Sequence, residues 1–422
     1  MAEVQPLRAL RYAPEVVGPL ADVVAPPYDV IDAAQRARLA ARSPYNVVHV
    51  DLPEGGDDPY RTAAEVLADW RAAGAVVHDE RPALWALRQE YTTPGGGPPR
   101  TRQGFFCRVR VEDYGPGRIR PHERTHPGPR EDRLRLTRAT RANLSPIFAL
   151  HSDPAGAAWG ALAPHAEGDP WADVTDDEGT RHRVWRVADP AAIEAAQAAL
   201  GDAELLIADG HHRYETARVY AEEVGGEGPH RYVLMCLVAL EDPGLTVFPT
   251  HRLVRGLTPE RQEALATAIR ASFDIEETDR AGLVPAEDGA GPLRLGYMDS
   301  HFKRPFALTL KDPAAVERAL SDRSEPYRRL DTAVLETLLL KDALGMSDDD
   351  ISHLEGLGYA RDADEALGLL DRGEYDAAFF LRATPVEQVR EVAAAGESMP
   401  PKSTFFYPKL LTGLLFNPLA DD

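Results

Sequence analysis

Five consecutive residues near the middle of the chain combine side chains that suit a phosphate site. Asp209, Gly210, His211, His212 and Arg213 follow one another directly. The arginine and the two imidazoles supply hydrogen-bond donors, and the aspartate supplies a metal ligand or a general base. The pattern predicts that His211, His212 and Arg213 bind the phosphates of a donor. Asp209 is then the catalytic carboxylate and the predicted metal ligand.

The elements on either side would place these residues at the end of a strand. Residues 205–208 are a short apolar run that predicts a buried strand, and a helical pattern begins at Tyr214. Gly210 permits a tight reversal between the two. A helix N-terminus favours anions, because its backbone N–H groups and its dipole both point toward them. The structural alternative is a capped helix in which Asp209 only holds a partly buried histidine pair.

A second group of candidates precedes this motif. His122 and Glu123 lie together in the turn-prone stretch 119–127, which predicts a catalytic imidazole and a carboxylate that competes with Asp209 as the base. Arg133, Thr137 and Arg141 then follow at helical spacing, which predicts a helix face turned toward an anion. A solvated helix with surface ion pairs is the ordinary alternative. The spacing of His122 and Glu123 matches no zinc motif.

Lysine is scarce, and two lysines fall in one short motif. Of the 47 lysine and arginine residues only five are lysines, and Lys402 and Lys409 both lie in 401–409. A compact ammonium differs from a guanidinium in geometry and hydration, which indicates a specific need for lysine there. Lys402, Ser403 and Thr404 together predict a phosphate-binding loop, although the glycines of a Walker loop are missing.

Two further pairs are weaker candidates. His251 and Arg252 repeat the polar chemistry of the central motif and are predicted to line the donor pocket. Tyr28 and Asp29 follow a double proline, which fixes the backbone and presents both side chains on a stiff turn. We expect Tyr28 and Asp29 to bind the substrate.

These motifs carry a family resemblance. The run 209–213 resembles the Asp-Gly-His-His-Arg box of the ParB/sulfiredoxin-like fold, whose members include nucleotide-binding partition proteins and free-serine kinases. Segments 25–31, 121–125 and 401–409 resemble, in the same order, the domain of unknown function 1015 (DUF1015) family. The resemblance implies a phosphotransferase related to free-serine kinases, with a nucleotide or pyrophosphate as the donor.

Composition excludes several kinds of partner. A net charge of −21 would be repelled by nucleic acid and by anionic lipid. The two cysteines lie in apolar strand-like runs, so no disulfide framework is indicated and a reducing cytoplasm fits. No apolar stretch is long enough for a signal peptide or a membrane helix. We therefore expect a cytoplasmic protein whose partner is a small molecule. No pattern in the sequence indicates an oligomeric state.

Alternating strand and helix patterns predict an α/β (α+β mixed) fold with a mixed sheet. Residues 1–255 are expected to form an N-terminal body that holds the ParB/sulfiredoxin-like core implied by the resemblance, interrupted by an insertion. Residues 256–422 are expected to form a C-terminal α/β lobe that contributes the motif 401–409. Within the N-terminal body, residues 45–53 alternate in a way that predicts a strand.

The predicted function is phosphoryl transfer to a small hydroxyl acceptor, with free serine as the expected acceptor. ATP, ADP or pyrophosphate is the expected donor, and Mg²⁺ would bridge its phosphates. One alternative is a nucleotide-binding regulatory switch that turns over no small molecule. A second alternative is a metal-dependent hydrolase built on His122, Glu123 and the histidine pair.

Overall fold

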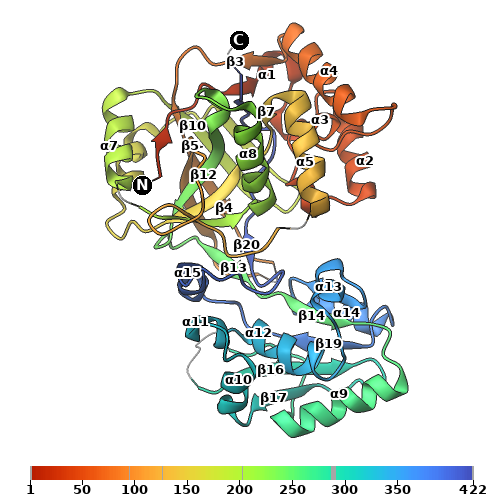
Figure 1. Ribbon diagram of the computed structural model, residues 1–422. Coiled ribbons are helices and arrows are strands. Elements are labelled where there is room, and N and C mark those ends of the chain that lie inside the picture. Colours follow the sequence, from red (N-terminus) through yellow and green to blue (C-terminus); the bar gives the residue numbers. More distant parts are fainter. Residues whose placement is uncertain (1, 95, 126, 202, 287–290, 421–422) are drawn as a thin grey trace. The chain divides into compact units, whose positions relative to one another are not determined.

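The chain divides into two compact units. A computed structural model describes residues 2–94, 96–125, 127–201, 203–286 and 291–420 (Figure 1). Unit 1 comprises Met1–Pro121, Thr125–Leu245 and Pro408–Asp422, and unit 2 comprises His122–Arg124 and Thr246–Tyr407. The break after Leu245 falls ten residues before the expected boundary at 255. The 401–409 motif is divided between the two units, because the chain returns to unit 1 from residue 408 onward.

Unit 1 is built on a nine-stranded mixed sheet with the order β6-β11-β8-β12-β5-β4-β10-β9, and β1 pairs with β5. The β8–β12 and β6–β11 pairs are parallel, and the other pairs are antiparallel. The predicted mixed α/β class is therefore confirmed. The strands are β1 (Val4–Gln5), β4 (Leu84–Tyr91), β5 (Arg100–Arg110), β6 (Ile119–Arg120), β8 (Ile147–His151), β9 (Ala172–Thr175), β10 (Arg181–Val187), β11 (Leu205–Asp209) and β12 (Tyr232–Ala239). Two smaller pairs join β2 (Leu10–Tyr12) to β3 (Val76–His78) and β7 (Ala142–Asn143) to β21 (Asn417–Pro418).

Helices cover this sheet, and two of them matter for the site. Helix α8 (His211–Val224) packs beside α5 (Pro127–Thr140), as Figure 1 shows. Tyr214 and Ala217 of α8 belong to the main core cluster of the sheet. The remaining helices are α1 (Pro14–Val17), α2 (Ala33–Arg42), α3 (Val48–Asp51), α4 (Pro59–Ala72), α6 (Ala157–Leu162) and α7 (Pro190–Leu200).

The strand–turn–helix predicted around Gly210 is confirmed. Strand β11 is buried over its first four residues, as its apolar run requires. Gly210 has φ 97° and ψ 29°, the left-handed conformation that glycine adopts without a Cβ clash. Helix α8 begins at His211, three residues before the expected start. His211, His212 and Arg213 therefore belong to its first turn.

The strand predicted over 45–53 is wrong. The segment instead forms the short helix α3, because the Asn46 side chain organises the turn that precedes it. Its Nδ2 donates to the carbonyl oxygens of Asp22 (2.8 Å) and Val24 (3.2 Å), and its Oδ1 accepts from the backbone N–H of Val48 (3.1 Å). Asparagine and aspartate side chains that form hydrogen bonds with the backbone in this way compete with the hydrogen bonds between strands. Asp51 thus lies at the end of a helix.

Unit 2 contains a six-stranded antiparallel sheet with the order β15-β17-β16-β19-β14-β18, and a separate β13–β20 pair. Its strands are β13 (Thr246–Phe248), β14 (His251–Val254), β15 (Phe273–Glu277), β16 (Arg294–Asp299), β17 (Phe306–Leu310), β18 (Leu357–Ala360), β19 (Ala377–Phe380) and β20 (Phe405–Tyr407). Its helices are α9 (Pro259–Ser272), α10 (Pro313–Ala319), α11 (Glu325–Arg328), α12 (Asp331–Leu335), α13 (Asp348–His353), α14 (Ala363–Asp371) and α15 (Val386–Ala394). Leu253, Met298 and Phe380 are among the residues of its core.

Two features bear on the expectations drawn from composition. Across the described residues, we find no helix with the length and apolar character needed to cross a bilayer. Cys107 and Cys236 are both buried free thiols.

Candidate functional site

The carboxylate of Asp209 lies between two cations at the N-terminus of α8. One oxygen, Oδ1, accepts from Lys409 Nζ at 3.1 Å, and the other, Oδ2, accepts from Arg213 at 2.8 Å. Lys409, which returns to unit 1 after the whole of unit 2, is only 18% exposed at its side chain. We call Asp209, Arg213 and Lys409 the charged cradle. With the partial positive charge of the helix end, the charged cradle carries an excess of positive charge that suits an anion.

The environment keeps the Asp209 carboxylate ionised. Burial alone would raise its pKa, but Lys409 and Arg213 outweigh burial, and His211 adds to their effect. The pKa of Asp209 therefore lies well below its ordinary range. Such a carboxylate is a poor proton acceptor near neutral pH. It is better suited to orienting the two cations than to acting as a base.

Gly210 is needed for the close approach of the Arg213 side chain. A Cβ atom at position 210 would lie 3.0 Å from Arg213 Nε and 3.3 Å from a side-chain carbon of Ile147. The guanidinium also donates to the backbone carbonyl of Pro146. Arg213 is thus held from two sides, which fixes its position in the charged cradle.

A buried arginine holds the backbone that carries Lys409. Arg102 is 1% exposed, and it donates through Nε to Gln89 Oε1 (2.9 Å) and also to the carbonyl oxygen of Pro408. The Gln89 amide in turn donates to the carbonyl oxygen of Lys409 (3.1 Å). The guanidinium lies over the Phe148 ring, 4.5 Å from its centroid, and burial lowers the pKa of Arg102 to about 10. This network ties residues 408–409 to the central sheet.

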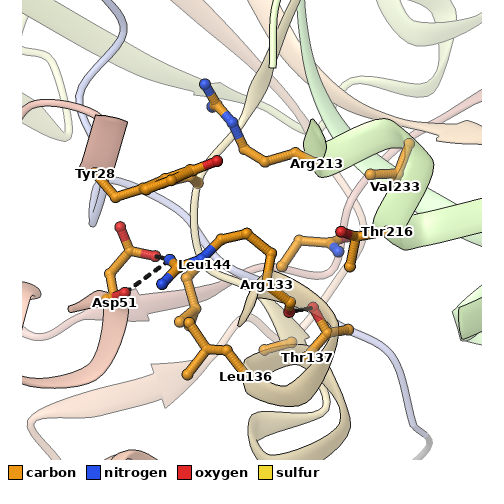
Figure 2. A pocket seen from close by; sticks show the side chains of 12 residues that line it. Tyr28, Asp51, Arg133, Leu136, Thr137, Leu144, Arg213, Thr216 and Val233 are labelled. Atoms are coloured by element: carbon orange, nitrogen blue, oxygen red, sulfur yellow. Dashed lines mark hydrogen bonds and ion pairs between the residues drawn. The ribbon is translucent and has the colours of Figure 1, made fainter. Parts of the chain in front are cut away.

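A pocket beside the charged cradle contains Arg213 together with the predicted substrate residue Tyr28 (Figure 2). The guanidinium of Arg133, on α5, lies under the Tyr28 ring, 4.3 Å from the ring centroid. It donates to the backbone carbonyl oxygen (2.8 Å) and to the carboxylate (3.2 Å) of Asp51. Burial, and then the charge of exposed Asp29, raises the pKa of Tyr28 far above its ordinary value. Tyr28 therefore remains a hydrogen-bond donor at all ordinary pH values.

The helix face predicted from Arg133, Thr137 and Arg141 lies only partly in this pocket. Arg133 and Thr137 are buried and line it. Arg141 is exposed and follows the last residue of α5 with φ 50°. The helix ends before Arg141 and so cannot carry it on the same face.

Seven of the predicted site residues lie in unit 2. His122 is fully buried, with its Nε2 3.0 Å from the Thr404 hydroxyl, and its carbonyl accepts from the Met399 N–H (2.8 Å). Ser403 is also buried, and its hydroxyl donates to the Pro400 carbonyl (2.6 Å). These bonds give His122, Thr404 and Ser403 a structural part in closing the loop before β20.

A second polar group of unit 2 surrounds Arg252. This buried guanidinium donates to the carbonyl oxygens of Lys402 (2.9 Å) and Pro401 (3.0 Å) and lies 4.7 Å from the Tyr359 ring centroid. Burial lowers the pKa of Arg252, while the charge of Glu123 is among those that raise it. Lys402 is exposed and has φ 56°. Its contact with Arg252 is made by its backbone carbonyl and not by its ammonium. His251 lies on the other face of β14 and contacts Phe380.

The predicted site residues thus form two groups. Asp209, His211, His212, Arg213, Tyr28 and Asp29 belong to unit 1, and Glu123, His122, Lys402, Ser403, Thr404, His251 and Arg252 belong to unit 2. Within unit 1, His211 is buried and His212 half-buried on the first turn of α8. The roles predicted for both groups stay predictions.

Sequence reasoning missed three residues of unit 1 that the structure brings to the charged cradle or the pocket. Lysine scarcity singled out the 401–409 motif, but nothing in it distinguished Lys409 from Lys402. Asp51 was hidden because its segment was predicted to be a strand. Thr216 lines the pocket and carries no sequence signal, because threonine on a helix is common.

Asp209 does not fit the role of a direct metal ligand in this arrangement. Both of its oxygens accept from cations, and a divalent ion there would be repelled by Lys409 and Arg213. Across the described ranges, no group of three or more His, Cys, Asp or Glu side chains is placed to hold a metal ion.

The structure defines a mixed α/β protein in which two cations pair with one carboxylate at a strand end. Its sequence matches the family described as "Protein of unknown function (DUF1015)" over residues 4–333, so the chain belongs to the DUF1015 family. The expected family membership is confirmed. Lys402 and Lys409 lie beyond the matched residues. None of the curated proteins compared with the sequence is similar to it.

Three solved structures resemble the chain distantly. A conserved hypothetical protein from Pyrococcus furiosus has 15% identity and a TM-score of 0.37, covering 73% of this chain and 95% of its own. A free serine kinase variant in complex with ADP has 14% identity and a TM-score of 0.39, covering 73% and 92%. SbnI with a C-terminal truncation from Staphylococcus aureus has 13% identity and a TM-score of 0.38, covering 74% and 87%. Similarity at this level carries no argument about activity.

Proposed function

We propose that the protein is a kinase-like phosphotransferase that transfers a phosphoryl group from a nucleotide or pyrophosphate to a small hydroxyl acceptor. Free serine is the acceptor to test first. The observation that carries the proposal is the charged cradle, in which Arg213 and Lys409 converge on Asp209 at the N-terminus of α8. Phosphoryl transfer depends mainly on positioning and charge neutralisation, and these residues supply both.

In the proposed reaction the acceptor hydroxyl oxygen forms a bond to the terminal phosphorus of the donor. The bond from that phosphorus to the bridging oxygen breaks, and the leaving phosphate keeps the electron pair. Arg213 and Lys409 neutralise charge on the donor, while Asp209 holds both cations in place. The hydroxyl proton passes to a general base. Glu123, which belongs to unit 2, stays a prediction from the sequence alone. Mg²⁺, if bound, would accompany the donor phosphates and supply further charge neutralisation.

The test is phosphoserine formation by the purified full-length chain. Serine and Mg²⁺ are supplied with ATP, ADP or pyrophosphate in parallel, and product is followed by mass. We expect product with at least one donor. Asp209→Asn should reduce its rate by about 100-fold, since both cations lose the charge that orients them.

Asp79→Asn is the matched control. Asp79 is 5% exposed and, like Asp209, is held by two cations, with Arg186 Nε at 2.6 Å and Arg11 Nε at 3.4 Å. It lies outside the charged cradle, so its variant should retain the parent rate after correction for the folded fraction. Absence of phosphoserine with all three donors, or equal losses in the two variants, would refute the proposal.

A further inference from the structure

The pocket that contains Tyr28 has features of a binding site that the proposed reaction does not yet use. Its volume is about 40 Å³, room for a few water-sized groups. The wall formed by Leu136, Leu144 and Val233 is apolar. The remaining wall carries hydroxyl, guanidinium and carboxylate groups. A small ligand with more than one polar group would match such a lining.

Thr216 gives an independent indication of a ligand. The side chain is 3% exposed and lines the pocket, and within the described residues its hydroxyl has no hydrogen-bond partner. Thr137 lines the same pocket, yet its hydroxyl donates to the Arg133 carbonyl one turn back at 2.9 Å. A buried hydroxyl without a partner costs free energy, so such groups in native proteins call for an explanation. A bound polar ligand would supply the missing partner.

The charges of the pocket are nearly balanced. Arg133 is neutralised by Asp51 and by Asp132, whose carboxylate lies 2.6 Å from its guanidinium. Arg213 is paired with Asp209, but within the described residues its two hydrogen bonds use only two of its five donors. A phosphate dianion would meet the buried Asp51 carboxylate without a surplus of positive charge. A ligand with one negative and one positive group avoids that penalty.

The Arg213 guanidinium and the Asp51 carboxylate come from different elements of the pocket. Arg213 and Thr216 lie three residues apart on α8, so they share one face of that helix. Asp51 lies at the end of α3, and Figure 2 shows it across the pocket from Thr216, with the Arg133 side chain between them. Burial raises the pKa of Asp51, which an ammonium beside it would counteract.

We infer that this pocket binds a small zwitterionic α-amino acid, with its carboxylate toward Arg213 and Thr216 and its ammonium toward Asp51. The claim that this pocket holds the phosphoryl acceptor rests on the proposed function, because Arg213 belongs to both the pocket and the charged cradle. The claim that the pocket binds an amino acid can be tested by binding alone, without turnover. The small volume of the pocket restricts the ligand to a short side chain, which serine satisfies.

The experiment is calorimetric titration of the full-length chain with L-serine, without a phosphoryl donor. Ethanolamine lacks the carboxylate, and L-glycerate lacks the ammonium. We expect serine to bind at least about tenfold more tightly than either analogue, because each analogue loses one of the two charge-assisted contacts. Equal binding of serine and glycerate would overturn the inference.

The matched variants are Thr216→Val and Thr180→Val. Thr180 is also fully buried, and its hydroxyl likewise has no partner among the described residues, but it does not line the pocket. Thr216→Val should weaken serine binding about fivefold, the weight of one neutral hydrogen bond, and Thr216→Ser should restore it. Thr180→Val should bind serine as the parent does. Equal affinities for parent and Thr216→Val would contradict the inference.

The two proposals fail in different ways. Serine binding that depends on Thr216, without phosphoserine from any donor, refutes the phosphotransferase and retains the amino-acid pocket. Phosphoserine formation whose KM for serine is the same in parent and Thr216→Val retains the phosphotransferase and refutes the pocket.

Discussion

One buried histidine, His251, makes the stability of unit 2 depend on pH. His251 is fully buried, and its Nδ1 accepts from the Leu381 N–H at 3.2 Å, so the proton of the neutral ring is on Nε2. A second proton would have to displace the bond to Leu381. Burial lowers the pKa of His251 to about 4, although the charge of Asp362 opposes this effect.

We predict that unit 2 loses stability as the pH falls from about 6.5 to about 4. The unfolded chain binds a proton at position 251 in this window and the folded chain does not, so stability is complete above the window and decreases within it. The loss should be about 3 kcal/mol. Amide hydrogen exchange of β14 and β19 at pH 7 and pH 4.5 measures it. His251→Gln should flatten the dependence, whereas exposed His353→Gln should not, and parallel pH profiles for all three proteins would contradict the assignment.

Residue types revealed part of the site, but contacts could not be read from them. The charges of Asp209 and Arg213 and the scarcity of lysine pointed to the segments that form the charged cradle. The choice between Lys402 and Lys409 depended on which side chain reaches Asp209, and that is decided by tertiary packing. Asp51 and Thr216 are ordinary residues whose importance comes only from their surroundings.

At the scale of elements, the turn between β11 and α8 determines the position of Arg213. Gly210 combines a left-handed backbone with a close approach to the Arg213 side chain. Gly156 provides a comparison, since it also precedes a helix, with φ 64° and ψ 26°, but a Cβ atom added there would have no atom within 4 Å. An alanine at position 156 would therefore meet only the strain of the left-handed backbone, whereas an alanine at position 210 would also crowd the Arg213 side chain.

We predict that Gly210→Ala and Gly156→Ala each lower the free energy of unfolding by about 1 kcal/mol, measured by urea denaturation. Only Gly210→Ala should also reduce the phosphotransferase rate, by about tenfold or more, because its methyl group displaces the guanidinium. A Gly210→Ala protein with the parent rate would show that the position of Arg213 is unimportant for turnover.

The strand–turn–helix could be predicted because its signals are local. Four apolar residues, a glycine and a helical period all occur within one short stretch. Helix α3 could not, because the Asn46 side chain that organises it bonds to residues 22 and 24, more than twenty positions earlier. An alternating pattern over a few residues is a weak guide when a distant contact decides the conformation.

At the scale of the whole molecule, residues 408–420 complete unit 1. Leu410, Leu411, Leu414, Leu415 and Phe416 are each at most 3% exposed, and β21 pairs with β7. Arg102 and Gln89 bond to the first two residues of this segment. The mixed α/β class was predictable from strand and helix patterns. The return of the chain to unit 1 was not, because apolar runs do not specify their partners.

We predict that Arg102→Met destabilises unit 1 by about 3 kcal/mol, because it leaves the Pro408 carbonyl and the Gln89 side chain unsatisfied in a buried place. Hydrogen exchange across residues 410–416 should accelerate at the same time. Arg100→Met, an exposed arginine on the same strand, should change stability by no more than about 0.5 kcal/mol. Unchanged exchange in Arg102→Met would show that the segment is anchored by its apolar residues alone.

The late position of Lys409 in the sequence affects when the charged cradle can form during synthesis. A ribosome makes Asp209 and Arg213 first, then residues 246–407 of unit 2, and only then Lys409. At about 5–20 residues per second, the interval lasts at least about ten seconds. Throughout that time the nascent chain has no Lys409 to pair with Asp209. The charged cradle therefore forms only after unit 2 has been translated, which delays its use until both units exist.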